Sequence, residues 1–243
     1  MIAQNLAAVR ARIEAAARNV GRDAAGVTLV AVTKEVDAAV AREAVALGLV
    51  DLGENRVKEL LKKQEALPGP DVRWHMIGTL QRNKVVQVVG RVGLIHSVDS
   101  VSLGEAIAGR AQAQGIRQGV LLEVNAGEER QKHGVAPSEA EEAARGLLDM
   151  TGLRLRGLMT VAPQGDLDAA RRAFRTLREL RDAIKMRAEE AIELSMGMTD
   201  DFEVAIEEGA TIVRIGTAIF GARETSRRKN DQVGKMKEEG SGK

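Results

Sequence analysis

The sequence predicts an α/β protein built as a single (β/α)8 TIM barrel with an extra N-terminal helix. Three observations predict it: eight short β-rich runs, amphipathic segments between them, and no Pro/Gly/Ser linker or break in composition along 243 residues. Amphipathic segments of this length can cross over to the next parallel strand, and eight such units fit into roughly 200 residues. The competing architecture is an open doubly wound sheet. A G-x-G-x-x-G turn after an early strand would favour it, and the sequence has none.

The chain begins with an amphipathic segment. Apolar residues recur there at helical spacing, at Ile2, Leu6, Val9 and Ile13. Charged residues at positions 10, 12 and 14 interrupt any apolar run, so the segment is expected to be a helix and not a signal peptide.

The β-rich runs and the amphipathic segments then alternate. The expected strands are 27–33, 49–53, 72–78, 92–98, 119–125, 154–161, 192–196 and 211–216. The clearest amphipathic segments are 37–47, 54–66, 100–115, 137–149 and 166–190. The first 225 residues are therefore expected to form one domain.

Composition excludes several classes of protein. A chain that is 44% hydrophobic and 29% charged is typical of globular proteins. The absence of cysteine excludes disulfides, thiolate catalysis and Cys-containing metal sites, and it suits a reducing compartment. No apolar run approaches the roughly 18 residues that would span a bilayer, so we expect a cytoplasmic protein with no membrane partner.

Charge is unevenly distributed along the chain. Residues 226–243 hold six Lys or Arg against three Asp or Glu, and with a net charge of +1 for the whole chain this leaves residues 1–225 at −2. A nucleic-acid-binding protein would usually show a basic body and stacking aromatic residues, whereas aromatic residues are 2% here. We therefore expect no nucleic-acid partner and a polar, disordered C-terminal tail over 226–243.

Lys34 is the sharpest single candidate for chemistry. In a barrel of this kind the site lies at the C-terminal ends of the strands, and Lys34 directly follows the first run. A partly desolvated lysine there has a lowered pKa and an amine free to form a Schiff base with an aldehyde. The alternative is a lysine at the rim that pairs with Glu35 or another carboxylate.

The seventh and eighth runs indicate an anion site. Ser195 precedes Met196-Gly197, and Gly216 is followed by Thr217, so both runs end in small-residue turns. Backbone N–H groups and hydroxyls in such turns can surround a phosphate, and phosphate sites after strands seven and eight recur in these barrels. Ordinary tight-turn glycine chemistry is the alternative.

Arg214 and the three histidines complete the candidates. Arg214 lies two residues before Gly216, on the same face of the strand, where it could donate to a ring nitrogen or a phosphate or else pair with a carboxylate inside the barrel. His75, His96 and His133 lack metal-ligand spacing and are expected to be hydrogen-bonded core or rim histidines.

Several longer motifs resemble one known family. The chain is similar to the YggS/PLPBP family of pyridoxal 5′-phosphate homeostasis proteins, related in fold to the N-terminal barrel of alanine racemase, from the first helix to about residue 223. The most specific pieces are AVTK (31–34), GENRVKE (53–59), WHMIGTLQRNK (74–84), HSVDS (96–100), VNAGEERQKHG (124–134), GLMTV (157–161) and the stretch 194–221.

The resemblance implies a pyridoxal 5′-phosphate cofactor and a role for each candidate. Lys34 resembles the lysine that forms the internal aldimine, and Asn55 resembles the asparagine beside the ring. Arg214 resembles the arginine that faces the pyridine nitrogen. The phosphate cradle of the family corresponds to Ser195, Gly216 and Thr217.

The resemblance also implies binding in preference to turnover. An arginine cannot accept a proton from the ring, so the ring nitrogen stays unprotonated and the cofactor is a poorer electron sink. The chain also has no tyrosine to serve as a second base. We therefore expect a monomeric protein that holds and buffers pyridoxal phosphate as a lysine aldimine for intracellular vitamin B6 homeostasis, with apo pyridoxal-phosphate-dependent enzymes as candidate recipients. The alternative is a low-activity racemase that uses a water or His75 as the opposite acid.

Overall fold

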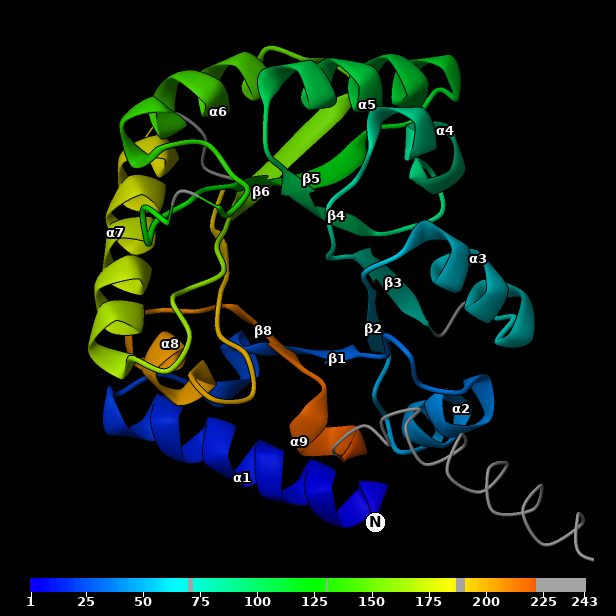
Figure 1. The fold of residues 1–243 in the computed structure, drawn as a ribbon, viewed down its shortest axis with the longest axis vertical. Helices are drawn as coiled ribbons and strands as arrows, with labels where there is room; N and C mark the ends of the chain where they lie inside the picture. Colours follow the sequence, from blue (N-terminus) through cyan, green and yellow to red (C-terminus); the bar gives the residue numbers. More distant parts are fainter. Residues whose placement is uncertain (70–71, 130, 187–190, 222–243) are drawn as a thin grey trace, which may run out of the picture.

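Eight parallel strands close into a barrel in sequence order, with β8 pairing back onto β1 (Figure 1). The computed structural model describes residues 1–69, 72–129, 131–186 and 191–221, so the expected tail at 226–243 lies outside the described residues. The strands are β1 (Thr28–Val32), β2 (Asp51–Glu54), β3 (Arg73–Met76), β4 (Leu94–Val98), β5 (Gln118–Glu123), β6 (Leu153–Met159), β7 (Glu193–Ser195) and β8 (Ile212–Ile215). The predicted (β/α)8 fold is confirmed.

Helices surround the ring of strands on the outside (Figure 1). The α-helices are α1 (Ile2–Asn19), α2 (Ala38–Ala46), α3 (Val57–Ala66), α4 (Val85–Val88), α5 (Val101–Ala113), α6 (Ala140–Leu148), α7 (Leu167–Lys185), α8 (Phe202–Glu207) and α9 (Thr217–Phe220). Short 3₁₀ turns η1 (Ala24–Gly26), η2 (Arg82–Lys84) and η3 (Pro137–Glu139) precede β1, α4 and α6.

Five helices fall within the five amphipathic segments, and α1 is the expected N-terminal helix. The last expected segment, 166–190, is helical as far as Lys185, and residues 187–190 lie outside the described part. Helices α4, α8 and α9 are not among the predicted segments. These helices have four to six residues, which is too short for a helical period to be recognised.

Side-chain caps set the start of three long helices. Asp37 accepts from the amide of Ala39 at 2.8 Å at the start of α2, and Asp166 accepts from Ala169 at 2.9 Å at the start of α7. Ser100 Oγ accepts from the amide of Leu103 in the same way at the start of α5. Each side chain satisfies one of the amides that a helix start leaves without a partner.

The extra helix α1 packs on the outside of the barrel, near the place where β8 pairs with β1. Its apolar residues Ile2, Leu6, Val9 and Ile13 are buried, as the spacing predicted. Arg12 makes a two-point ion pair with Glu203 of α8 at 3.0 and 2.8 Å, and Asn5 donates to the carbonyl of Ile219 in α9 at 3.0 Å. The helix therefore fixes the two segments that follow β7 and β8.

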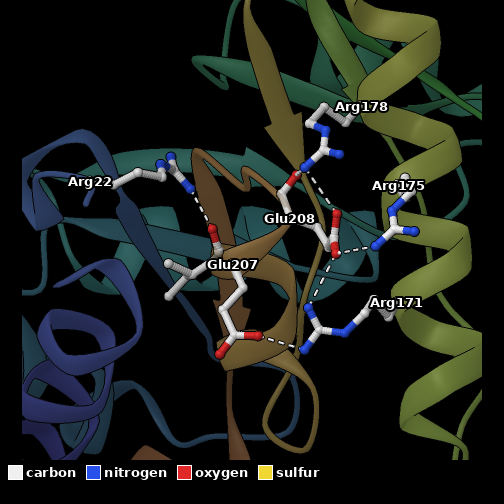
Figure 2. Close-up of polar contacts among 7 residues, drawn as sticks. Arg22, Arg171, Arg175, Arg178, Glu207 and Glu208 are labelled. Atoms are coloured by element: carbon white, nitrogen blue, oxygen red, sulfur yellow. Dashed lines mark hydrogen bonds and ion pairs between the residues drawn. The ribbon is translucent and has the colours of Figure 1, made fainter. Parts of the chain in front are cut away.

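A cluster of arginines joins α7 to the end of α8 (Figure 2). Arg171, Arg175 and Arg178 lie on one face of α7 and surround the Glu208 carboxylate, with N–O distances of 3.1, 3.2 and 2.9 Å. Glu208 directly follows α8, where a helix dipole disfavours a carboxylate. Burial also disfavours the charge, but the arginines overcome both effects and lower the pKa of Glu208 below its ordinary value.

In the part of the chain that the structure describes, no helix combines the length and the apolar character needed to cross a membrane.

Candidate functional site

A cavity of about 490 Å³ opens at the C-terminal ends of β2, β3, β5 and β6. It is lined by Asn55, Arg56, Ile77, Gly78, Thr79, Glu123, Val124, Asn125, Gln131, Lys132, His133, Met159 and Val161. Only Asn55 of the six predicted binding residues lines this cavity. The other five belong to β7 or β8 or lie within two residues of the C-terminal end of β1 or β8. In the barrel, β1 lies between β2 and β8, and β7 is next to β8.

Lys34 lies in a tight turn that leaves β1. The amide of Val36 donates to the carbonyl of Thr33 at 3.0 Å across this turn, and Glu35 has a φ of +62°. The left-handed conformation is unfavourable for a residue with a Cβ, so surrounding contacts must hold the turn. Lys34 itself is half-buried, and its side chain makes no hydrogen bond or ion pair with another described residue. The alternative of a lysine paired with a carboxylate is not what the structure shows.

A buried ion pair lies beneath this turn. Glu54, at the end of β2, is completely buried and accepts from Thr33 Oγ1 at 2.6 Å and from Lys63 Nζ at 2.5 Å. Lys63 comes from α3 and also donates to the carbonyl of Thr33. Burial raises the pKa of Glu54, and the hydrogen bonds from Lys63 and Thr33 oppose that shift. The pair ties α3 to the residue before Lys34. The sequence pattern predicted neither residue, because their ion pair forms only when α3 packs back over β2.

Asn55 presents an unused acceptor. Its Oδ1 is buried and has no hydrogen-bond partner among the described residues. Gly78 packs directly against its backbone, since a Cβ at Gly78 would lie 2.3 Å from the carbonyl oxygen of Asn55. A buried polar atom without a partner costs stability, so Asn55 is a position where a bound ligand would restore a hydrogen bond.

Arg214 and Ser195 meet inside the barrel. Arg214 NH1 donates to Ser195 Oγ at 2.6 Å, and NH2 donates to the carbonyl of Thr160 at 2.9 Å. No described residue accepts from Nε. Burial lowers the pKa of Arg214 to about 10, against the opposing effect of nearby carboxylates. The guanidinium is therefore charged at neutral pH, and these contacts use two of its five N–H groups. The Nε–H is among those left for a ligand, and no carboxylate partner of Arg214 is found among the described residues.

Two of the three histidines extend this contact across the barrel. His96 lies on β4 and contacts Ser195 Oγ through Nδ1 at 2.9 Å and His75 Nδ1 through Nε2 at 3.0 Å. His75 Nε2 contacts Asp51 Oδ1 at 3.0 Å. The prediction of hydrogen-bonded core histidines is confirmed for both. His75 lines a different cavity, of about 360 Å³, at the N-terminal ends of the strands. The alternative that makes His75 an acid opposite Lys34 is therefore not supported by its position.

Gly216 and Thr217 lie where β8 passes into α9. A Cβ at Gly216 would lie 3.2 Å from the carbonyl oxygen of Val32, so this turn packs closely against the end of β1, two residues before Lys34. Thr217 is exposed at the first position of α9. The first amides of a helix have no partner within the helix, and here they lie beside the turn that carries Lys34.

Glu123 is a third residue of the site that was not predicted from the sequence. It is a buried carboxylate at the end of β5, it lines the 490 Å³ cavity, and it lies in an otherwise apolar run, which was the available signal. Burial, with the charge of Asp99 in second place, raises the pKa of Glu123 to about 7 in spite of His133 and Arg214. Perturbed carboxylates of this kind are typical of functional sites.

The fold and this arrangement can be compared with known proteins. The family model described as the N-terminal domain of alanine racemase matches residues 4–224. A protein named pyridoxal phosphate homeostasis protein from Aquifex aeolicus is 46% identical over 223 residues, which are 91% of this chain and 98% of that protein. The protein of the same name from Pseudomonas aeruginosa is 43% identical and covers 92% of this chain and 96% of its own length.

Solved structures agree with this similarity. PipY of Synechococcus elongatus with PLP bound has a TM-score of 0.79 at 34% identity and covers 91% of this chain and 100% of PipY. An unknown protein from Bifidobacterium adolescentis has a TM-score of 0.86 at 41% identity and covers 90% of this chain and 94% of that protein. Alanine racemase from Clostridium difficile, at 14% identity and a TM-score of 0.71, shares the fold over 93% of this chain and 57% of the racemase.

Proposed function

The chain belongs to the alanine racemase N-terminal domain family, with curated relatives named pyridoxal phosphate homeostasis protein at 34–46% identity, and we propose that it binds and buffers pyridoxal 5′-phosphate for intracellular vitamin B6 homeostasis. The PLP-bound PipY structure supports this proposal. The observation in this protein that carries it is the half-buried Lys34, which has no side-chain partner among the described residues and follows β1, the strand that pairs with β8 and its buried Arg214. The Nε–H of Arg214 is also unused by any described residue.

The donor set fits the cofactor. Pyridoxal phosphate supplies an aldehyde that condenses with a lysine amine, and a pyridine ring that withdraws electrons. We assign the amine to Lys34 and the contact with the ring nitrogen to Arg214. The unpartnered Oδ1 of Asn55 supports a place for Asn55 beside the ring.

The phosphate is assigned to the ends of β7 and β8. Ser195 offers a hydroxyl that the charged guanidinium of Arg214 already contacts at 2.6 Å. Gly216 and Thr217 offer the first amides of α9 and the Thr217 hydroxyl. Charged donors and backbone amides are the groups that bind phosphate strongly in proteins.

The residues of the site favour holding the cofactor over turnover. Arg214 remains charged at neutral pH, since its pKa is about 10, so it can only donate to the ring nitrogen, and its positive charge disfavours protonation of that nitrogen. The chain has no tyrosine to act as a second base, and both nitrogens of His75 are engaged by Asp51 and His96. The protein is accordingly a binding protein and not a two-base racemase.

The remaining parts of the proposal concern partners and location. We place the protein in the cytoplasm, in accord with a chain free of cysteine, and propose apo pyridoxal-phosphate-dependent enzymes as recipients. We also propose a monomer. The exposed large hydrophobic residues of the described part support it because they are spread over several helices and loops, at Met1, Val20, Val86, Val101, Ile116, Leu148, Leu167, Met186 and Ile192. The barrel unit is proposed to extend over residues 1–225.

The test is an absorbance spectrum of the protein with pyridoxal phosphate, before and after borohydride, followed by mass mapping of the reduced peptide. We expect a band that collapses on reduction and an adduct on Lys34. Lys34→Ala removes the adduct but retains weaker noncovalent binding, whereas Lys58→Ala, at an exposed lysine of α3, changes neither. A spectrum that added cofactor cannot alter contradicts the function, and an adduct on Lys132 of the cavity wall contradicts the assignment of the lysine.

A further inference from the structure

A continuous row of hydrogen bonds crosses the barrel from β3 to β7. It starts at the N-terminal ends of β2 and β3, where Arg73 makes a two-point ion pair with Asp51 at 2.8 and 2.5 Å. The row continues from Asp51 to His75, from His75 to His96 and from His96 to Ser195, with distances of 3.0, 3.0 and 2.9 Å. It therefore links a cavity at one end of the barrel to the phosphate site assigned at the other.

The protons in this row can be assigned from charge and burial. The hydrogen bonds from Arg73 and His75 outweigh burial and hold the pKa of Asp51 at about 2, so Asp51 is a carboxylate that only accepts, and His75 Nε2 carries a proton. Complete burial, together with the electrostatic effect of His75 and Arg214, keeps the pKa of His96 well below its ordinary value. His96 is therefore neutral and has one ring proton.

Two proton arrangements satisfy every contact. In the first, His96 Nε2 donates to an unprotonated His75 Nδ1, and Ser195 donates its hydroxyl proton to His96 Nδ1. The Ser195 hydroxyl then donates to His96 and accepts from Arg214, so it has no proton left for a phosphate. In the second, His75 carries two protons and donates to His96 Nε2, while His96 Nδ1 donates to Ser195 Oγ. The hydroxyl proton of Ser195 is then free to point toward a ligand.

We propose that His75 and His96 are positioning residues that accept a proton from the phosphate site and thereby turn the Ser195 hydroxyl toward the bound phosphate. One proton passes to Ser195 Oγ from the phosphate monoanion, or from a water molecule that leaves as hydroxide. The former Ser195 proton passes to His96 Nδ1, and the His96 Nε2 proton passes to His75 Nδ1. The ligand is then a dianion that accepts from Ser195, and the new positive charge lies against Asp51. This inference rests on the proposed phosphate site.

The other charged groups near His75 are compatible with a second proton on its ring. The charged or titratable groups that face it are Asp51 from β2, Arg73 from its own strand, His96 from β4 and, around the cavity at the N-terminal ends of the strands, Arg117, Arg154, Arg156 and Glu193. Asp51 is the one in direct contact with the ring nitrogen that already bears a proton. Arg214 lies beyond His96, next to Ser195.

The decisive measurement is the ¹⁵N spectrum of histidine-labelled protein at pH 8, since the chain has only three histidines and the spectra of His133→Gln and His75→Gln together assign all three. In the free protein we expect His75 and His96 each with a proton on Nε2 only. With excess pyridoxal phosphate, His75 becomes doubly protonated and His96 moves its proton to Nδ1. The proposal is overturned if His96 keeps its Nε2 proton in the complex. It is also overturned if His96 already carries the Nδ1 proton in the free protein.

Proton uptake on binding gives a second readout. It is compared in the Glu123→Gln background, because Glu123 also titrates near pH 7 in the adjoining cavity. At pH 8 the phosphate of the free ligand is already a dianion, so binding takes up about one proton from solvent. The affinity for pyridoxal phosphate therefore falls about tenfold more per unit rise in pH than it does in a His75→Gln protein. Asp51→Asn, which keeps an acceptor for His75 but removes the charge, reduces the uptake. Equal uptake in all three proteins overturns the proposal, while absence of cofactor binding contradicts the proposed function instead.

Discussion

Glu123→Gln is expected to stabilise the ligand-free protein above neutral pH. Glu123 is a buried carboxyl in the wall of the ligand cavity, and the folded protein raises its pKa from 4.5 to about 7. Between these pH values the folded state retains a proton that the unfolded state has released. The free energy of unfolding of the wild-type protein therefore falls as the pH rises from 4.5 to about 7.

The size of the effect follows from the pKa values. Each pH unit between them is worth about 1.4 kcal/mol, so ionising Glu123 costs the folded protein about 3 kcal/mol at pH 8 and almost nothing at pH 4.5. Glutamine has nearly the shape of the protonated carboxyl and cannot ionise. The variant should therefore be more stable than the wild-type protein by up to that amount at pH 8, and the difference should disappear toward pH 4.5.

Urea unfolding at a series of pH values between 4.5 and 8 measures this difference. Glu43→Gln is the matched control, because Glu43 is exposed on α2. The free energies of unfolding of Glu43→Gln and the wild-type protein should differ by the same amount at every pH in this range. A Glu123→Gln protein that is less stable than wild type at pH 8, or that differs from it equally at both ends of the range, would refute the reasoning.

Three further predictions concern the contacts described above. Glu208→Gln should lower the free energy of unfolding by about 1–2 kcal/mol at pH 7. Because the folded protein lowers the pKa of Glu208, the loss should shrink as the pH falls below 4.5, which urea unfolding at pH 7 and pH 3 checks. Asp51→Asn should cost about 2 kcal/mol at pH 7 and about half of that at pH 3; an equal cost at both would show that the carboxylate charge is not the cause. Ser195→Ala and Thr217→Ala should each weaken pyridoxal phosphate binding by about 1–3 kcal/mol, and unchanged dissociation constants in both would move the phosphate site elsewhere.

Much of the fold could be predicted because it depends on local patterns. Each of the eight apolar runs overlaps one strand, although β2, β5 and β6 extend one residue beyond the run. The spacing of Ile2, Leu6, Val9 and Ile13 marks the buried face of α1. Helices α8 and α9 have six and four residues, and their position depends on contacts with α1. Sequence periodicity could not reveal them.

The residues of the candidate site also fall into those that local patterns reveal and those that depend on tertiary contacts. Lys34, Ser195 and Arg214 could be selected because each falls at or near the end of an apolar run, and a parallel barrel gathers strand ends at one rim. Glu54 and Lys63 could not, because their ion pair forms only when α3 packs back over β2. Glu123 is a charged residue in an apolar run, and its raised pKa depends on burial by other strands.

The sequence by itself determined which residues alternate between core and solvent, which chain segments become strands, and which side chains stand at their ends. Only the tertiary structure decided which of these side chains share a proton. His75, His96 and Ser195 are separated by 21 and 99 positions along the chain. They come into contact because eight strands close into a ring whose interior is filled by side chains, where these buried polar groups hydrogen-bond to one another.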